Sequence, residues 1–229
     1  MADEIERRFL VHPSRVEEAI RNSSAVERIV QGYLGFKANT VRLEHKPGSV
    51  GLITITGLNG PVRLEIPDKD AQMMRANDLK DPGGFINADA MTVRVRIKDD
   101  SRGLFTLKGR SKGITCPEYE YDLPLSEARE LMTSDAQFVV HKTRHSVPAS
   151  AYLHLFEVDR FHGILEGRTM SEVELGSENE PVVVPGWCGP EISGMRQFSN
   201  LSLGKLTVAD LPALDAEIAR LFAGAGSLA

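Results

Sequence analysis

The chain has 229 residues, 41% of them hydrophobic and 26% charged, which is an ordinary composition for a globular protein with a sizeable core. Its net charge of −5 argues against nucleic acid or an anionic membrane as a partner, so that any basic site has to be local. Two cysteines without CxxC spacing fit a reducing compartment, and no apolar segment reaches the length of a membrane span. These features predict a cytoplasmic protein with a small-molecule partner, no nucleic acid and no membrane, and they leave a homodimer open.

Alternating apolar and polar residues predict at least eight strands, separated by loops that contain Pro, Gly, Asn or Asp. In chain order, the expected strands are 3–11, 26–35, 91–98, 103–109, 117–123, 137–147, 152–161 and 169–176. Helices are expected at 14–20, 126–132 and 207–222, the last from apolar residues at helical spacing. We expect this last helix to pack on the outside of the sheet.

The segment 36–90 looks like a degenerate copy of the segment that follows it. Residues 40–57 (TVRLEHKPGSVGLITITG) and 92–109 (TVRVRIKDDSRGLFTLKG) are identical at nine of eighteen positions, where unrelated sequences would share about one. The likeness continues from 61–74 to 117–132. The repeated unit is therefore a hairpin, a third strand and a helix.

The two copies differ in charge. The first has Glu44 where the second has Arg96, and Thr56 where the second has Lys108. The first copy has thus lost the basic face, and we interpret it as scaffold.

Charges on the expected strands are sorted by sign. A spacing of two places each set on one face of its strand. The acidic sets are Glu4/Glu6, Glu118/Glu120/Asp122, Glu157/Asp159 and Glu172/Glu174, and the basic sets are Arg94/Arg96/Lys98 and Lys142/Arg144. A sheet with one face in water would explain why apolar and charged residues alternate. It would not explain why acidic and basic residues lie on different strands.

This separation favours an interior site for a metal-bound polyanion. Carboxylates close to one another are unfavourable unless a cation holds them, and hard ions such as Mg²⁺ or Mn²⁺ take oxygen ligands. Arginine forks match phosphate oxygens. A closed barrel of about eight strands has an interior wide enough for a ligand.

Nine short sequence motifs follow one another along the chain: EIERRFLV (4–11), VQGYL (30–34), VRVRI (93–97), FTLKGR (105–110), PEYEYDLPL (117–125), HKTRHSVP (141–148), FEVDRFHG (156–163), SEVELGSENE (171–180) and FSNLSL (198–203). Together they resemble the ordered motifs of the CYTH superfamily, the triphosphate tunnel metalloenzymes. The resemblance covers about two thirds of the chain and leaves 36–90 outside. It implies an α+β fold, an eight-stranded antiparallel β-barrel forming the triphosphate tunnel, with helices packed outside and an inserted β-rich segment.

On this resemblance, we interpret 1–229 as a single CYTH-like tunnel domain in which 36–90 is an inserted degenerate repeat of the hairpin-plus-helix unit at 92–132. Members of the superfamily bind a triphosphate group with Mg²⁺ or Mn²⁺. They include inorganic triphosphatases, thiamine triphosphatases and class IV adenylate cyclases.

The resemblance also implies roles for individual residues. The metal ligands are expected at Glu4, Glu6, Asp159, Glu172 and Glu174. The phosphate-binding residues are expected at Arg8, Arg94, Arg96, Lys108, Lys142 and Arg144. Three further inward-facing acids, Glu118, Glu120 and Glu157, would orient the basic residues, contact a second ion or serve only as ion-pair partners.

Two positions are catalytic candidates, Arg8 and Tyr33. The opening motif of the family has lysine where this chain has Arg8, and in some triphosphatases that lysine pairs with a tyrosine corresponding to Tyr33. Because arginine keeps its proton near neutrality, we expect Arg8 to bind phosphate instead of acting as a base. Tyr33 is either that partner or a core aromatic.

The expected function is metal-dependent hydrolysis of a linear triphosphate, with inorganic triphosphate favoured. A class IV adenylate cyclase and a thiamine triphosphatase are the alternatives, although no motif indicates a nucleoside pocket. Arg8 and the degenerate repeat also leave open a binding module for polyphosphate or a nucleotide that has no catalytic activity.

Overall fold

Eight strands form a closed antiparallel ring in the computed structural model, which describes residues 2–34, 41–57, 59–77, 84–86, 91–109, 112–149 and 154–225. The strands are β1 (Ala2–Val11), β2 (Ala25–Leu34), β7 (Thr92–Lys98), β8 (Arg102–Lys108), β9 (Thr115–Leu123), β10 (Ala136–Pro148), β11 (Leu155–Phe161) and β12 (Thr169–Glu174). Their order is β12-β11-β10-β2-β7-β8-β9-β1, and β12 pairs with β1. The predicted fold class, an eight-stranded antiparallel barrel, is confirmed.

The predicted strand ends are close to those of the structure. Where both positions are described, they differ by one or two residues at most. Predicted strand residues 35, 152 and 153 lie outside the described residues, as do residues 36–40, 58, 78–83 and 87–90 of the predicted inserted segment. Sequence patterns did not indicate β13 (Cys188–Glu191), which pairs with β1, because it is short and has no clear alternation.

The chain divides into two compact units. The first comprises Met1–Asp3, Val30–Lys112 and Cys116–Val139. The second comprises Glu4–Ile29, Gly113–Thr115 and Val140–Ala229.

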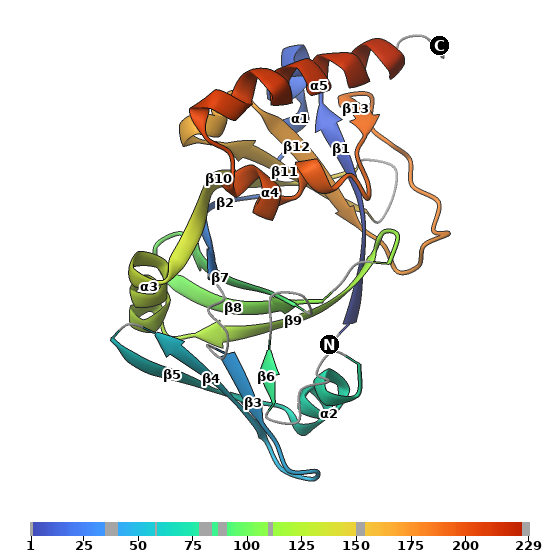
Figure 1. Ribbon diagram of the computed structural model, residues 1–229. Helices are drawn as coiled ribbons and strands as arrows, with labels where there is room; N and C mark the ends of the chain where they lie inside the picture. Colours follow the sequence, from blue (N-terminus) through green and yellow to red (C-terminus); the bar gives the residue numbers. More distant parts are fainter. Residues whose placement is uncertain are drawn as a thin grey trace. The chain divides into compact units, whose positions relative to one another are not determined.

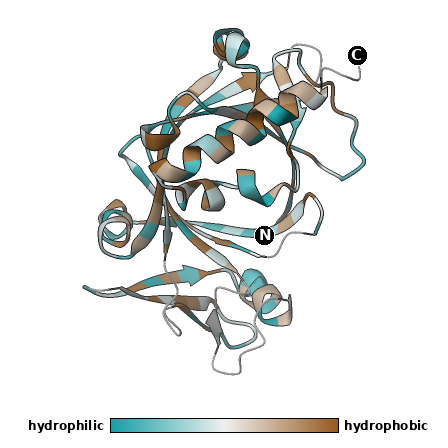
Figure 2. Ribbon diagram, turned by 45° about the horizontal axis from the view of Figure 1, so that its top comes forward, coloured by the Kyte–Doolittle hydropathy of each residue, from teal (hydrophilic) through white to brown (hydrophobic). Residues whose placement is uncertain are grey.

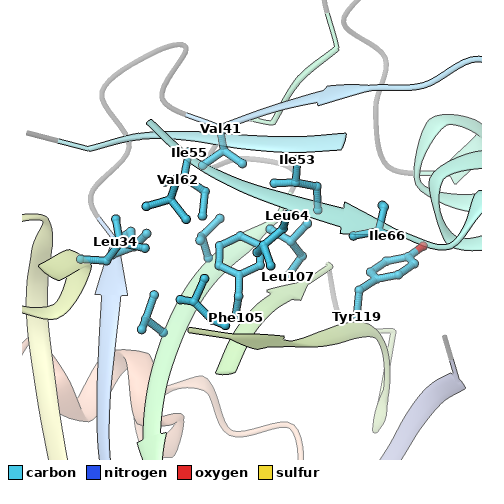
Figure 3. Packing of buried hydrophobic residues seen from close by; sticks show 14 of the residues in the cluster. Leu34, Val41, Ile53, Ile55, Val62, Leu64, Ile66, Phe105, Leu107 and Tyr119 are labelled. Carbon is cyan, nitrogen blue, oxygen red and sulfur yellow. The ribbon is translucent and has the colours of Figure 1, made fainter. Parts of the chain in front are cut away.

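The first unit contains a second sheet beside β7, β8 and β9. Its strands are β3 (Val41–Glu44), β4 (Gly51–Gly57), β5 (Gly60–Ile66) and β6 (Phe85–Ile86), in the order β5-β4-β3-β6. The unit also has helices α2 (Asp68–Asn77) and α3 (Leu125–Ser134). Figure 3 shows the apolar side chains of β3, β4 and β5 packed against Phe105, Leu107 and Tyr119 in one buried cluster. The second sheet therefore covers the apolar face of β7 to β9.

The two hairpins of this unit pair in the same register. Val41 lies opposite Ile55 in β3 and β4, as Val93 lies opposite Leu107 in β7 and β8. The match extends to the third strands, where β4 pairs with β5 as β8 pairs with β9. Helices α2 and α3 follow these strands and have ten residues each. Both segments therefore have the same order of elements and the same strand register.

In the second unit, the sheet of β1, β10, β11 and β12 has two different faces. One face is apolar and buries Phe9, Val158 and Val173 with Trp187. The other face carries charges and then, at one end, the apolar residues Leu10 and Phe161. The alternation of side chains along each strand separates the two faces.

Helical segments cover both faces of this sheet. They are η1 (Pro13–Arg15), α1 (Val16–Ile20), η2 (Gly163–Leu165), η3 (Arg196–Phe198), α4 (Asn200–Gly204), η4 (Val208–Asp210) and α5 (Leu211–Ala225). The predicted helix 207–222 is present as η4 and α5, and the Thr207 backbone N–H donates to Asp210 at its start. Figure 2 shows hydrophobic and hydrophilic residues interspersed along α5, and Leu214 buries its side chain in the cluster of Leu10 and Phe161.

Both units can be followed in Figure 1, where α3 lies beside β7 and β8 and α5 lies beside β13. Within the described ranges, no helix combines the length and the apolar character that crossing a membrane requires.

Candidate functional site

The first unit holds a cluster of charges on the strand face opposite its apolar core. We call it the first cluster and define it as Arg94, Arg96, Thr106, Lys108, Glu118 and Glu120. These residues alternate along β7, β8 and β9 with the buried residues of the core, such as Val95 and Phe105. Period-two alternation therefore places the basic and acidic residues of these three strands on one face.

Carboxylates hold the cations of the first cluster. Arg94 Nη2 lies 2.9 Å from Glu118 Oε1, and Lys108 Nζ lies 3.2 Å from Glu118 Oε2. Arg96 Nη1 lies 3.5 Å from Glu120 Oε2. Both arginines are buried, with exposures of 7% and 8%. Because buried charges need partners, Glu118 and Glu120 act here as counter-ions for the basic residues.

No sequence pattern indicated a role in the site for Gln31, which lies at the edge of the first cluster. Its side chain is fully buried; Nε2 donates to the Tyr33 hydroxyl at 2.7 Å, and Oε1 accepts from Arg96 Nη2 at 3.4 Å. The spacing of two between Gln31 and Tyr33 could have indicated that they share a strand face. Tyr33 is therefore linked through Gln31 to an arginine.

The second unit holds its own charged cluster, the second cluster, defined as Glu4, Glu6, Arg8, Lys142, Arg144, Glu157, Asp159, Glu172 and Glu174. At its centre, Asp159 accepts from Lys142 Nζ at 2.5 Å and from Arg144 Nε and Nη2 at 2.7 Å each. Burial acts to raise the pKa of Asp159, but Arg144 and Lys142 lower it well below its usual range. Asp159 is therefore ionised, and both of its oxygens are engaged.

Arg144 joins three carboxylates. Besides Asp159, it donates through Nη2 to Glu172 at 2.9 Å and through Nη1 to Glu157. Burial favours the neutral form of Arg144, but the negative charges of Asp159, Glu172 and Glu157 outweigh it and raise the pKa above its usual value. Three carboxylates around one arginine give the cluster an excess of negative charge.

Glu157 and Glu172 lie directly opposite each other on β11 and β12. Burial raises the pKa of Glu157, with the charge of Glu172 acting in the same direction. Burial acts likewise on Glu172, but Arg144 and Lys142 lower its pKa overall. The pKa values of these two adjacent carboxyl groups are therefore shifted in opposite directions.

Strand β1 supplies the remaining residues of the second cluster. Arg8 pairs in register with Glu172, and Glu6 with Glu174, while Glu4 precedes them on the same face of β1. Arg8 Nε lies 3.4 Å from Glu6 Oε1, and Arg8 Nη1 donates to the Phe198 carbonyl at 3.3 Å. Arg8 is thus fixed both to a carboxylate and to η3.

The donor chemistry of the second cluster suits a hard divalent cation. All of its candidate ligands are carboxylate oxygens, which Mg²⁺ and Mn²⁺ prefer. In the described part of the chain, however, no three acidic, histidine or cysteine side chains form a group that could hold a metal ion. Asp159 and Glu172 are instead engaged with Lys142 and Arg144. The residues fit such an ion chemically, and binding it would require some of these ion pairs to open.

The chain is similar to curated proteins named inorganic triphosphatase. The protein from Acetivibrio thermocellus is 37% identical over 124 residues, which is 53% of this chain and 78% of the relative. The protein from Nitrosomonas europaea is 26% identical over 124 residues, which is 52% of this chain and 80% of the relative. A crystal structure of an inorganic triphosphatase is similar over 90% of this chain and 97% of its own, at 22% identity and a TM-score of 0.48. No family model matches the chain.

Its class is that of closed antiparallel barrels with charged residues on alternate strand positions. Within this class, the identity and coverage of the Acetivibrio thermocellus protein show that the chain belongs to the inorganic triphosphatase family.

Proposed function

We propose that this chain hydrolyses inorganic triphosphate in a reaction that requires a divalent metal ion. The observation that carries the proposal is the set of buried basic residues, Arg94, Arg96, Lys142 and Arg144, that lie among carboxylates on barrel strands, in a chain of this family. Buried cations of this kind supply charge-assisted hydrogen bonds to phosphate oxygens. A linear triphosphate, which carries several negative charges, suits such residues.

The basic residues of each cluster are proposed as phosphate-binding residues. In the first cluster these are Arg94, Arg96 and Lys108, and in the second they are Arg8, Lys142 and Arg144. Their carboxylate partners keep the cations paired until phosphate oxygens replace some of those partners. The acids Glu118, Glu120 and Glu157 would then orient the basic residues.

The carboxylates of the second cluster would hold the metal. We propose Glu4, Glu6, Glu172, Glu174 and Asp159 as ligands, with the condition that Asp159 has to be released in part from Lys142 and Arg144. A bound Mg²⁺ or Mn²⁺ supplies charge neutralisation at the phosphates and lowers the pKa of a coordinated water.

The chain itself contributes position and charge. In-line phosphoryl transfer to water needs the phosphates fixed and the developing negative charge stabilised. Arg8 would do this as a permanently charged donor that is anchored to the Phe198 carbonyl. We propose Tyr33, whose hydroxyl accepts from Gln31 Nε2 and is linked through Gln31 to Arg96, as the second catalytic residue.

A substrate panel tests the proposal. The purified chain would be given Mg²⁺ or Mn²⁺ with tripolyphosphate, thiamine triphosphate or ATP in separate reactions. We expect phosphate release to be fastest from tripolyphosphate. Cyclic AMP from ATP would instead support a cyclase, faster release from thiamine triphosphate would support that substrate, and tight binding without any product would rule out the enzyme.

The Glu172→Gln variant tests the metal assignment. We expect this isosteric change to abolish turnover and to weaken Mn²⁺ binding in calorimetry, with an unchanged circular dichroism spectrum, because one anionic oxygen ligand is lost. Glu44→Gln, at an exposed position of β3, is the control and should keep both properties. Wild-type activity and Mn²⁺ affinity in Glu172→Gln would refute the assignment.

A further inference from the structure

Thr106 lies at the centre of the first cluster, although its side chain is uncharged. It sits on β8 opposite Arg94 of β7 on one side and Glu120 of β9 on the other. Its exposure is 0%. A hydroxyl buried between an arginine and a carboxylate is in a position to bond with both.

The Thr106 hydroxyl acts both as a hydrogen-bond acceptor and as a donor. Its oxygen accepts from Arg94 Nη2 at 3.2 Å and from Arg94 Nε at 3.4 Å, and it donates to Glu120 Oε2 at 3.0 Å. Threonine is also β-branched, which restricts rotation about χ1. The row Arg94–Thr106–Glu120 is therefore a directed chain of hydrogen bonds across three neighbouring strands.

The first copy of the hairpin shows that the sheet itself does not require this row. Thr54 lies opposite Arg42, in the register of Thr106 and Arg94. On its other side, Thr54 faces Arg63, which has no acceptor. Arg42 pairs with Glu44 on its own strand at 3.1 Å. The same backbone therefore forms without the Arg–Thr–Glu row.

We propose that Thr106 is a positioning residue for substrate binding, which acts by holding the Arg94 guanidinium in the orientation that receives a phosphate group. This inference rests on the proposed triphosphatase function. An arginine whose rotamer is already fixed loses less conformational entropy when it binds its ligand. The hydroxyl therefore contributes to affinity without touching the substrate.

The first test is Thr106→Val, which replaces the hydroxyl with a methyl group of similar size. We expect KM for tripolyphosphate to rise about tenfold, the equivalent of one hydrogen bond to a charged group, while kcat changes less than about twofold. Thr106→Ser restores the hydroxyl and should restore KM. Thr54→Val is the matched control from the first copy and should leave KM and kcat at wild-type values.

A double-mutant cycle separates positioning from a structural role. If Thr106 acts through Arg94, Thr106→Val should have little further effect on KM in an Arg94→Lys background. Equal effects of Thr106→Val in both backgrounds, or no rescue by serine, would overturn the inference. Should Thr106→Val not fold, Thr106→Ala carries the same expectations.

Failure of the inference and failure of the proposed function give different results. If the wild-type chain hydrolyses tripolyphosphate and Thr106→Val has the wild-type KM, the inference is wrong and the function stands. If the wild-type chain does not hydrolyse tripolyphosphate, the proposed function fails. Calorimetric binding of tripolyphosphate to wild type and Thr106→Val then decides the inference, and equal affinities or no binding overturn it.

Discussion

The segments 41–77 and 92–134 fold into the same three strands and helix, yet among their described residues buried arginines occur in the second segment alone. On the faces that meet in the core, both segments have apolar residues in matching register. On the opposite face, Arg42 and Glu44 of the first segment are exposed and paired with each other, with exposures of 47% and 51%. Arg94 and Arg96 of the second are buried and held by Glu118 and Glu120.

The agreement of the two segments extends to single contacts. A Cβ on Gly51 would lie 2.6 Å from Ala71 Cβ, and a Cβ on Gly103 would lie 2.8 Å from Ala128 Cβ. In both cases a helix packs on a strand through glycine and alanine. The backbone and the core are therefore set by residues that the copies share, whereas the chemistry of the site is set by residues in which they differ. We propose that the first segment is a duplicate that kept the residues of the backbone and the core and lost those of the site.

Exchanging charges between the copies should have the largest effect. Arg96→Glu introduces the first copy's residue, removes a cation and places a second carboxylate beside that of Glu120. We expect kcat/KM for tripolyphosphate to fall about a thousandfold, since like charges in contact cost several kcal/mol. The reciprocal control, Glu44→Arg, lies on an exposed face and should change kcat/KM less than twofold. Equal losses in both variants would contradict the difference between the copies.

Truncation of the equivalent helix residues tests whether both copies belong to one core. Met74 in α2 and Leu131 in α3 are both buried in the same cluster. We expect Met74→Ala and Leu131→Ala each to lower the free energy of unfolding by about 3 kcal/mol, because each leaves a cavity. Urea denaturation measures both. A nearly neutral Met74→Ala would mean that the first copy unfolds independently.

Replacing the equivalent glycines Gly51 and Gly103 by alanine should lower the free energy of unfolding by modestly different amounts. A Cβ at Gly103 would lie 2.5 Å from the Leu123 carbonyl oxygen, whereas the closest atoms at Gly51 belong to the side chains of Ala71 and Ile66. Because backbone atoms yield less easily than side chains, we expect Gly103→Ala to destabilise by about 2 kcal/mol and Gly51→Ala by less. Thermal unfolding of the two variants compares them directly, and the reverse order would show that α2 is held more rigidly than α3.

The smallest expected effect concerns a hydrogen bond between the copies. The Tyr121 hydroxyl donates to Asp70 Oδ2 at 2.9 Å, and Asp70 is buried. We expect Tyr121→Phe to lower the free energy of unfolding by about 1 kcal/mol. Asp70→Asn, which keeps an acceptor oxygen, should cost less. If Asp70→Asn costs more, the charge of Asp70 matters beyond this hydrogen bond.

The sequence was sufficient to predict the strands of the barrel and the strand face on which each charged residue lies. Strict alternation, as in 92–98, determines both at once. It could not show that Asp159 binds Lys142 and Arg144 with both oxygens, because that depends on the register of β10 with β11. Nor did it single out Gln31 and Thr106, since uncharged residues on a charged face have no distinctive pattern. Hydrogen bonds of this kind follow from strand pairing and cannot be deduced from a single strand.

The packing of the two copies has a consequence for assembly. A surface that packs on a duplicate of itself is self-complementary, which is the property that symmetric homodimers use at their interfaces. Here the partner of the β7 to β9 face is supplied by the same chain. Without the strands of 41–66, the face that carries Val95 and Phe105 would be an exposed apolar surface. The segment 41–77 thus places inside one polypeptide an apolar contact of the kind that symmetric homodimers form between two subunits.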